Sequence, residues 1–140
     1  MESAKVEHIL ANFTVEDIME TQFSQLFENA SMEAAANYIR QGHERNFLVF
    51  AEDQQIVGTV NEASVIKAIK SDDLQSETLK YTEISQIPAV YTSEKLKTVY
   101  DKLYSYKHTI LPVLENGQIV GVIDDYILNS FLLEKRKNKK

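Results

Sequence analysis

The chain has 140 residues, a hydrophobic content of 44% and no cysteine, a composition typical of a globular protein. The absence of cysteine excludes a disulfide scaffold, a thiolate metal site and a thiol nucleophile. The net charge is −6, but the last six residues carry five of the fifteen basic side chains, which leaves a net charge of −11 for the remainder. A body this acidic repels a phosphate backbone, so we expect no nucleic-acid binding.

No stretch of the sequence predicts insertion into a membrane. The longest apolar run, Phe47–Ala51, falls far short of the roughly 20 residues that a membrane-spanning helix needs. The first ten residues also lack the basic and then apolar layout of a secretion signal. We therefore expect a cytoplasmic location, either for the chain by itself or as the cytosolic part of a membrane protein.

The first predicted element is a helix within residues 1–13. Val6, Ile9, Leu10 and Phe13 recur at the spacing that places side chains on one face of a helix. This helix lies outside the repeated part of the chain that follows, so its apolar face must cover something in the remainder.

An internal repeat dominates the remainder of the sequence. Residues 46–61 and 109–124 align without a gap, and each copy has an apolar run, a polar turn and a second apolar run. The second copy carries Asn116-Gly117 in its turn, which is a strong short-range hairpin signal. Each copy is therefore predicted to be a β-hairpin, and the repeat decides the fold of the whole chain.

Helical patterns surround both hairpins, and short strands precede them, so each repeat is predicted to run β-α-β-β-α in an α/β (α+β) fold. The inner faces predicted for the helices are Met32, Ala35, Ala36 and Ile39 after an N-cap at Ser31; Val65, Ile66 and Ile69 after Asn61; Leu96, Val99, Tyr100 and Leu103 after Ser93; and Ile127, Leu128, Phe131 and Leu132 after Asp124. The predicted boundaries are 1–13 for the extra N-terminal helix, 14–73 for unit one, 74–80 for a linker, 81–133 for unit two and 134–140 for a basic tail.

The repeated motifs resemble a known family. Val15–Met19 before the first copy, Leu111–Leu114 with the following Asn-Gly turn, and Ile-Val-Gly before the last helix of each copy are similar to a tandem pair of cystathionine-β-synthase-type (CBS) domains, or Bateman module. The resemblance implies two units related by pseudo-twofold symmetry and packed sheet against sheet. It also implies an adenine-nucleotide site in the cleft between them, and pairing of two modules into a homodimer.

A narrower resemblance concerns the segments Val15–Met19 and Gly42–Val49. Together they are similar to the CBS pair attached to some site-2-type intramembrane zinc proteases. Because the chain has no His-Glu-x-x-His helix and no spanning segment, the resemblance implies at most the regulatory part of such a peptidase.

The family's ligand signature is Gly-x-x-Thr/Ser-x-x-Asp, in which the hydroxyl contacts phosphate and the carboxylate holds the ribose. In copy one, Asn61 stands at the phosphate position and Ser64 replaces the ribose carboxylate. In copy two, Asp124 brings a negative charge to the phosphate position and Ile127 has no polar atom for a ribose, so this site is expected to bind no nucleotide. The ligand-binding residues that the resemblance implies are Gly58, Phe47, Asn61, Ser64 and Asp124.

No constellation in the sequence predicts catalysis or metal binding. There is no Gly-x-Ser-x-Gly elbow, and the three histidines lack carboxylate partners at ligand spacing, so we expect no catalytic residue and no metal. The first hypothesis is a regulatory module that senses AMP, ADP, ATP or another adenosyl ligand and controls an attached or partner protein. The alternatives are a ligand-free dimerisation module and a fragment of a larger membrane protease or transporter.

Overall fold

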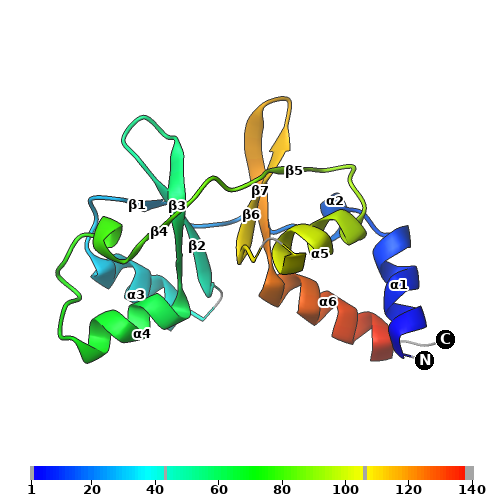
Figure 1. Cartoon of the computed structure of the whole chain (residues 1–140), viewed down its shortest axis with the longest axis horizontal. Helices are drawn as coiled ribbons and strands as arrows, with labels where there is room; N and C mark the ends of the chain where they lie inside the picture. The colour runs from blue at the N-terminus through cyan, green and yellow to red at the C-terminus, as the bar shows by residue number, and fades with distance from the viewer. Residues whose placement is uncertain (1, 43, 106, 138–140) are drawn as a thin grey trace. The chain divides into compact units, whose positions relative to one another are not determined.

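The computed structural model describes residues 2–42, 44–105 and 107–137, and its helices and strands follow the predicted order. The element series β-α-β-β-α occurs twice, which confirms the repeat and the mixed α/β fold (Figure 1). The elements are α1 (Glu2–Asn12), α2 (Val15–Ile18), β1 (Leu26–Phe27), α3 (Met32–Arg40), β2 (Asn46–Phe50), β3 (Ile56–Asn61), α4 (Glu62–Lys70), the 3₁₀ helix η1 (Thr78–Tyr81), β4 (Glu83–Ile84), β5 (Val90–Tyr91), α5 (Leu96–Ser105), β6 (Ile110–Glu115), β7 (Gln118–Asp124) and α6 (Asp125–Lys137).

The chain divides into two compact units that are not contiguous in sequence. Unit 1 consists of Met1–Gln22 and Pro88–Lys140, and unit 2 consists of Phe23–Ile87. The contacts therefore group α2, which lies within the predicted unit one (14–73), with the elements of the second repeat. The boundaries of the two repeats in the sequence, 14–73 and 81–133, remain a prediction.

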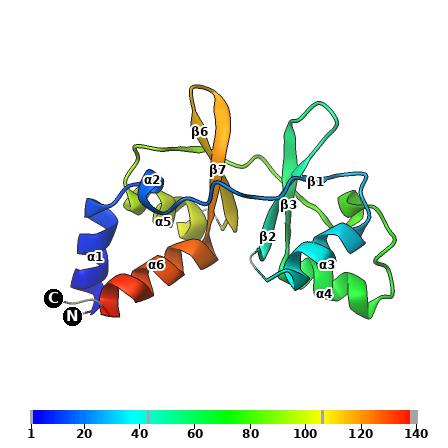
Figure 2. The same cartoon turned by 180° about the vertical axis from the view of Figure 1, so that it is seen from behind.

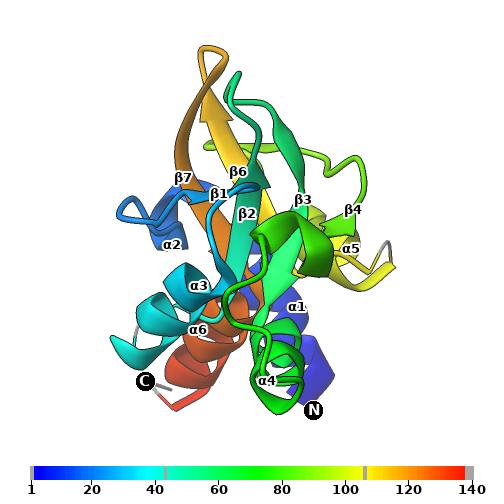
Figure 3. The same cartoon turned by 90° about the vertical axis from the view of Figure 1, so that its left-hand side faces the viewer.

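Unit 2 has a four-stranded sheet in the order β1-β2-β3-β4. Strand β1 runs parallel to β2, while β2, β3 and β4 pair antiparallel. Helices α3 and α4 lie side by side against this sheet (Figures 1 and 3). The buried core between helices and strands contains Leu26, Met32, Ala35, Ala36, Phe47, Val49, Val60, Val65 and Ala68.

Unit 1 has a three-stranded sheet in the order β5-β6-β7, with β5 parallel to β6 and the β6–β7 hairpin antiparallel. The extra helix α1 packs against α5 and α6 (Figure 2). Ile9 and Leu10 are buried as the spacing predicts, and the Phe13 ring meets the Phe131 ring edge-on at 5.1 Å. The N-terminal helix thus covers the helices of the second repeat.

The inner face predicted for α4 is wrong in two of its three residues. Val65 is buried, but Ile66 and Ile69 are 45% and 50% exposed. Ala68 is buried beside Val65, because α4 contacts α3 and the sheet along a stripe only one residue wide per turn. Two isoleucines therefore remain on the surface of the helix.

The start of α5 also differs from the prediction. Ser93 was expected to cap the helix, yet α5 begins at Leu96, because Glu94 folds into a turn whose backbone N–H donates to Tyr91 at 3.0 Å. The carbonyl of Glu94 accepts from the Val15 N–H at 2.9 Å, so the docked α2 segment holds this turn. Tyr100, predicted to be in the core, is 39% exposed on the helix surface.

At the C-terminus, α6 continues to Lys137, beyond the predicted boundary at residue 133, and the last three residues of the basic tail lie outside the described residues. Among the helices that the structure describes, none has the length and apolar character required to cross a bilayer.

Candidate functional site

Unit 2 contains a pocket of about 330 Å³ beside the start of α4. This volume is near the lower end of the range that small-molecule sites occupy. Two segments form its wall: the first turns of α4, and the chain from η1 into β4. The lining residues are Ser64, Lys67, Lys80, Tyr81, Thr82 and Glu83.

Asn61 and Ser64 connect the predicted ligand signature to this pocket. Asn61 is the N-cap of α4, and its Oδ1 accepts hydrogen bonds from the Ser64 backbone N–H at 3.0 Å and from the Ser64 Oγ at 3.1 Å. The bond to the backbone satisfies one of the free N–H groups at the helix start. The bond to Oγ fixes the Ser64 hydroxyl at the pocket wall, where the family has its ribose carboxylate.

Gly58 sets the position of the opposite wall. A Cβ on this residue would lie 2.2 Å from the Glu83 carbonyl oxygen and 2.8 Å from Thr82 Cγ2. The φ angle of Gly58 is not positive, so the glycine is required by the close approach of β4, not by the backbone conformation. The close approach is made by the strand that lines the pocket.

An acidic residue just outside the lining holds two of the pocket residues. Asp73 Oδ2 accepts hydrogen bonds from Lys80 Nζ and from the Tyr81 hydroxyl, both at 2.6 Å. Its other oxygen accepts from Ser76 Oγ at 2.5 Å. The bond from Lys80, followed by those from Ser76 and Tyr81, holds the pKa of Asp73 well below its usual range. The same contacts raise the pKa values of Lys80 and Tyr81.

Phe47 does not line this pocket. Its side chain is 1% exposed in the core of unit 2, where its ring lies 5.9 Å from that of Tyr38. Phe47 therefore supports the sheet from which β3 and the pocket wall extend, and it offers no surface to a ligand within unit 2.

Asp124 lies in unit 1 and has a structural partner. Its Oδ1 accepts the Ile127 backbone N–H at 2.7 Å, so Asp124 caps α6 as Asn61 caps α4. Asp124 is only 6% exposed. Of the predicted ligand-binding residues, Ser64 lines the pocket of unit 2, Asn61 is bonded to Ser64, and Asp124 belongs to unit 1.

Sequence reasoning missed the charged and aromatic residues of the pocket. Lys67 lies one helical turn after Ser64, a spacing that places both side chains on the same face of α4. Lys80 ends the predicted polar linker (74–80), and Tyr81 begins the predicted unit two (81–133). Their relation to Gly58 depends on the pairing of β3 with β4, which no local pattern reveals.

For metal binding, the described part of the chain holds no group of three histidine, aspartate or glutamate side chains close enough to share an ion. His8, one of the three histidines, lies on α1, where the Asn12 side chain donates to its backbone carbonyl at 2.7 Å.

Comparison with known proteins agrees with the repeat. The CBS domain family matches residues 15–71 and again 82–134. Homoserine O-acetyltransferase of Methanococcus vannielii is 23% identical over 130 residues, which are 88% of this chain and 26% of that protein. The chain spans about a quarter to a half of the length of the curated relatives it matches.

Two solved structures with bound ligands share the fold. The CBS domain pair of protein MJ0100, in complex with 5′-methylthioadenosine and S-adenosyl-L-methionine, has a TM-score of 0.72 at 17% identity, covering 88% of this chain and 98% of that one. The structure of CBSX2 in complex with AMP has a TM-score of 0.65 at 17% identity, covering 89% and 99%. The narrower resemblance to membrane proteases stays a prediction.

Two family matches that cover most of the chain, together with the repeated β-α-β-β-α series, lead to one conclusion: this protein belongs to the CBS domain family and is a tandem CBS pair, a module of the regulatory kind.

Proposed function

We propose that the chain is a non-catalytic regulatory module that binds an adenine nucleotide or a related adenosyl ligand in the pocket of unit 2 and controls an attached or partner protein. The observation that carries this proposal is a pocket lined by Ser64, Lys67 and Lys80. Asn61 orients the Ser64 hydroxyl, and Gly58 lets the β4 wall of the pocket approach closely. Hydroxyl and ammonium groups beside a helix start suit the ribose and phosphate of such a ligand.

The adenosyl ligands of MJ0100 and CBSX2 support the class of compound, and the greater length of the homoserine O-acetyltransferase relative supports an attached protein as the regulated target. The ligand acts on its target only through a difference in affinity between two states of the module. A cytoplasmic location is part of the same proposal, since adenosyl metabolites are the expected signal.

A thermal-shift panel with AMP, ADP, ATP, S-adenosylmethionine and 5′-methylthioadenosine tests the proposal. Binding at 100 times Kd adds about 2.7 kcal/mol to the free energy of unfolding and raises the melting temperature by several degrees. The matched variants are Asn61→Ala and Asp124→Ala, because each removes a helix cap and costs about 1 kcal/mol in the absence of ligand. We expect the ligand-induced shift to disappear in Asn61→Ala and to persist in Asp124→Ala. Absence of any shift in the wild-type protein would contradict the proposal.

A second candidate function is assembly without a ligand, which the exposure of Ile66 and Ile69 on α4 favours. Adjacent exposed isoleucines are typical of contact surfaces. If two modules pair through this helix, Ile66→Glu with Ile69→Glu converts the dimer to a monomer in sedimentation equilibrium. The control Ala63→Glu adds one glutamate at an exposed position of the same helix and leaves the dimer intact. A monomeric wild-type protein at all concentrations would exclude this function.

A further inference from the structure

The pocket of unit 2 has a charge balance that bears on which adenosyl ligand it accepts. Four charged residues lie in or against it: Lys67, Lys80 and Glu83 in the lining, and Asp73 bonded to Lys80. The two ammonium groups are thus matched by two carboxylates. A pocket built for a polyphosphate would instead present an excess of cations.

Asp73 is held firmly in place behind the pocket. Its backbone N–H donates to the Ala68 carbonyl at the end of α4 at 2.8 Å, and its side chain accepts from Ser76, Lys80 and Tyr81. An isolated exposed ion pair contributes little. Here three donors on one carboxylate form a network, so a ligand phosphate that draws Lys80 away must also disturb the other bonds to Asp73.

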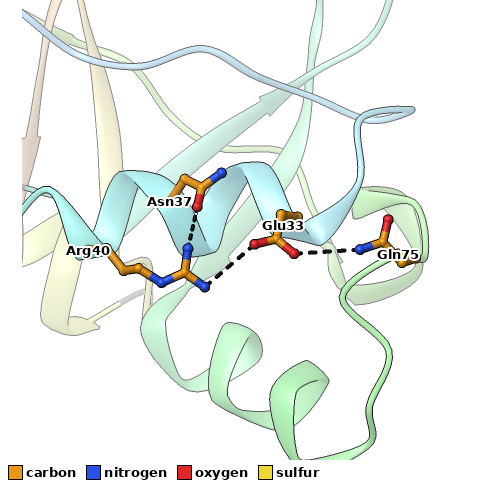
Figure 4. Close-up of polar contacts among 4 residues, drawn as sticks. All are labelled: Glu33, Asn37, Arg40 and Gln75. Atoms are coloured by element: carbon orange, nitrogen blue, oxygen red, sulfur yellow. Dashed lines mark hydrogen bonds and ion pairs between the residues drawn. The ribbon is translucent and has the colours of Figure 1, made fainter.

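The loop that carries Asp73 is itself fastened to α3. The Met32 N–H donates to the Ser76 carbonyl and the Glu33 N–H to the Leu74 carbonyl, both at 2.9 Å. Figure 4 shows the side-chain part of this attachment, in which Gln75 Nε2 donates to the Glu33 carboxylate at 3.5 Å. Arg40, on the same helix as Glu33, also lies 3.5 Å from that carboxylate. Because the loop is anchored at several points, Asp73 does not readily move away to release Lys80.

We infer that Asp73 is a specificity-determining positioning residue, which keeps Lys80 engaged and so makes the pocket select adenosyl ligands with at most one phosphate over nucleoside diphosphates and triphosphates. The inference rests on the proposed function and adds the ligand class to it. Lys67 remains as the lining cation for a single phosphate, and the Ser64 hydroxyl is oriented by Asn61 beside it. Because Lys80 is already paired with Asp73, it does not stabilise the further phosphates of ATP, and the carboxylates of Glu83 and Asp73 repel them.

The test compares calorimetric affinities for adenosine, AMP, ADP and ATP in the full chain. We expect wild-type protein to bind AMP at least as tightly as ATP. In Asp73→Asn the freed Lys80 raises the affinity for ATP relative to AMP about three- to fivefold, the size of one additional exposed charge interaction. Lys80→Met alone changes this ratio by less than about twofold, and the double variant Asp73→Asn with Lys80→Met loses the gain. If Asp73 had only a structural role, Asp73→Asn would lower the affinities for ATP and AMP equally and leave their ratio unchanged.

The outcomes separate this inference from the proposed function. Wild-type protein that binds ATP more than about tenfold more tightly than AMP overturns the ligand class and leaves the nucleotide site standing. An ATP-to-AMP ratio that Asp73→Asn does not change overturns the role of Asp73. Failure of all four compounds and of S-adenosylmethionine to bind overturns the proposed function itself, and the ligand class with it.

Discussion

The two repeats begin their last helix in the same way but surround it with different chemistry. Asn61 and Asp124 each accept a backbone N–H three residues later, at 3.0 and 2.7 Å. A neighbouring segment passes close to the glycine of each hairpin. A Cβ added to Gly58 would clash with the Glu83 carbonyl oxygen, and a Cβ added to Gly121 would clash with the Glu20 carbonyl oxygen. The backbone frame is therefore repeated, and the two copies differ in the side chains mounted on it.

Equal spacing in the two copies makes the difference explicit. Where copy one has Ser64, Lys67 and Lys80 around the pocket, the corresponding positions of copy two hold Ile127, Ser130 and Asp17. The hydroxyl and both cations are replaced by an apolar group, a neutral group and an acid, and Asp124 adds a further negative charge. The two copies thus share their helix caps and crossing strands, while the serine hydroxyl and the two lysines at these positions are present in copy one only.

The largest effect is expected from filling the two glycine contacts. In Gly58→Ala the added Cβ meets backbone at 2.2 Å, so β4 must move, which we expect to cost about 3 kcal/mol of unfolding free energy. In Gly121→Ala the nearest backbone atom is 2.8 Å away, and the cost should be about 1 kcal/mol. Urea denaturation of both variants measures the difference. Equal losses of unfolding free energy in the two variants would show that Gly58 and Gly121 are packed equally tightly, which would contradict the expected difference between the two copies.

A second effect concerns the ribose position. Ser64→Asp supplies a carboxylate to the pocket, and a hydrogen bond to a charged group contributes about 1.5–3 kcal/mol, so affinity for AMP should rise roughly 10- to 150-fold in calorimetry. Ile127→Asp makes the same change in copy two, where the cations are missing, and should create no binding. If Ile127→Asp produces a second AMP-binding site, the side chains around Asp124 do not prevent nucleotide binding in copy two.

The smallest effect is the pH dependence that Asp73 confers on unit 2. Its folded-state pKa is depressed by the bond from Lys80, so its contribution to stability is present above the unfolded pKa of about 4 and is lost as pH falls toward the folded value. The difference in unfolding free energy between wild type and Asp73→Asn should be constant near pH 6–7 and shrink below about pH 4. In Tyr81→Phe, which removes one donor, the folded-state pKa of Asp73 is less depressed, so the loss begins at the same pH but is smaller and is complete at a higher pH. A difference that persists unchanged to pH 2 would disagree with this assignment.

The comparison also explains how far the sequence could predict the molecule. The hairpins, the caps at Asn61 and Asp124 and the family follow from local patterns, because turn residues, N-caps and alternating strands are specified within a few residues. The exposure of Ile66 and the late start of α5 depend on which surfaces neighbouring elements cover. Sequence periodicity reports an apolar residue but not the presence of a partner.

The residues of the candidate site likewise fall into those that a local motif predicts and those that depend on strand pairing. Gly58, Asn61 and Ser64 belong to one continuous motif and were predicted together. Lys80 and Tyr81 reach that motif only through the β3–β4 pairing, which brings a segment about twenty residues later against Gly58. Phe47 was implied by the resemblance alone, and its burial in the core shows that position in a motif does not establish access to a ligand.

The most direct test of a single anion-binding copy is an amide NMR titration of the full chain, combined with calorimetric stoichiometry, using the nucleoside compound that gives the largest thermal shift. We predict one ligand per chain, with shift changes centred on Ser64, Lys67 and residues 80–83. Two ligands per chain, or changes centred on Asp124 and Ile127, would contradict the account.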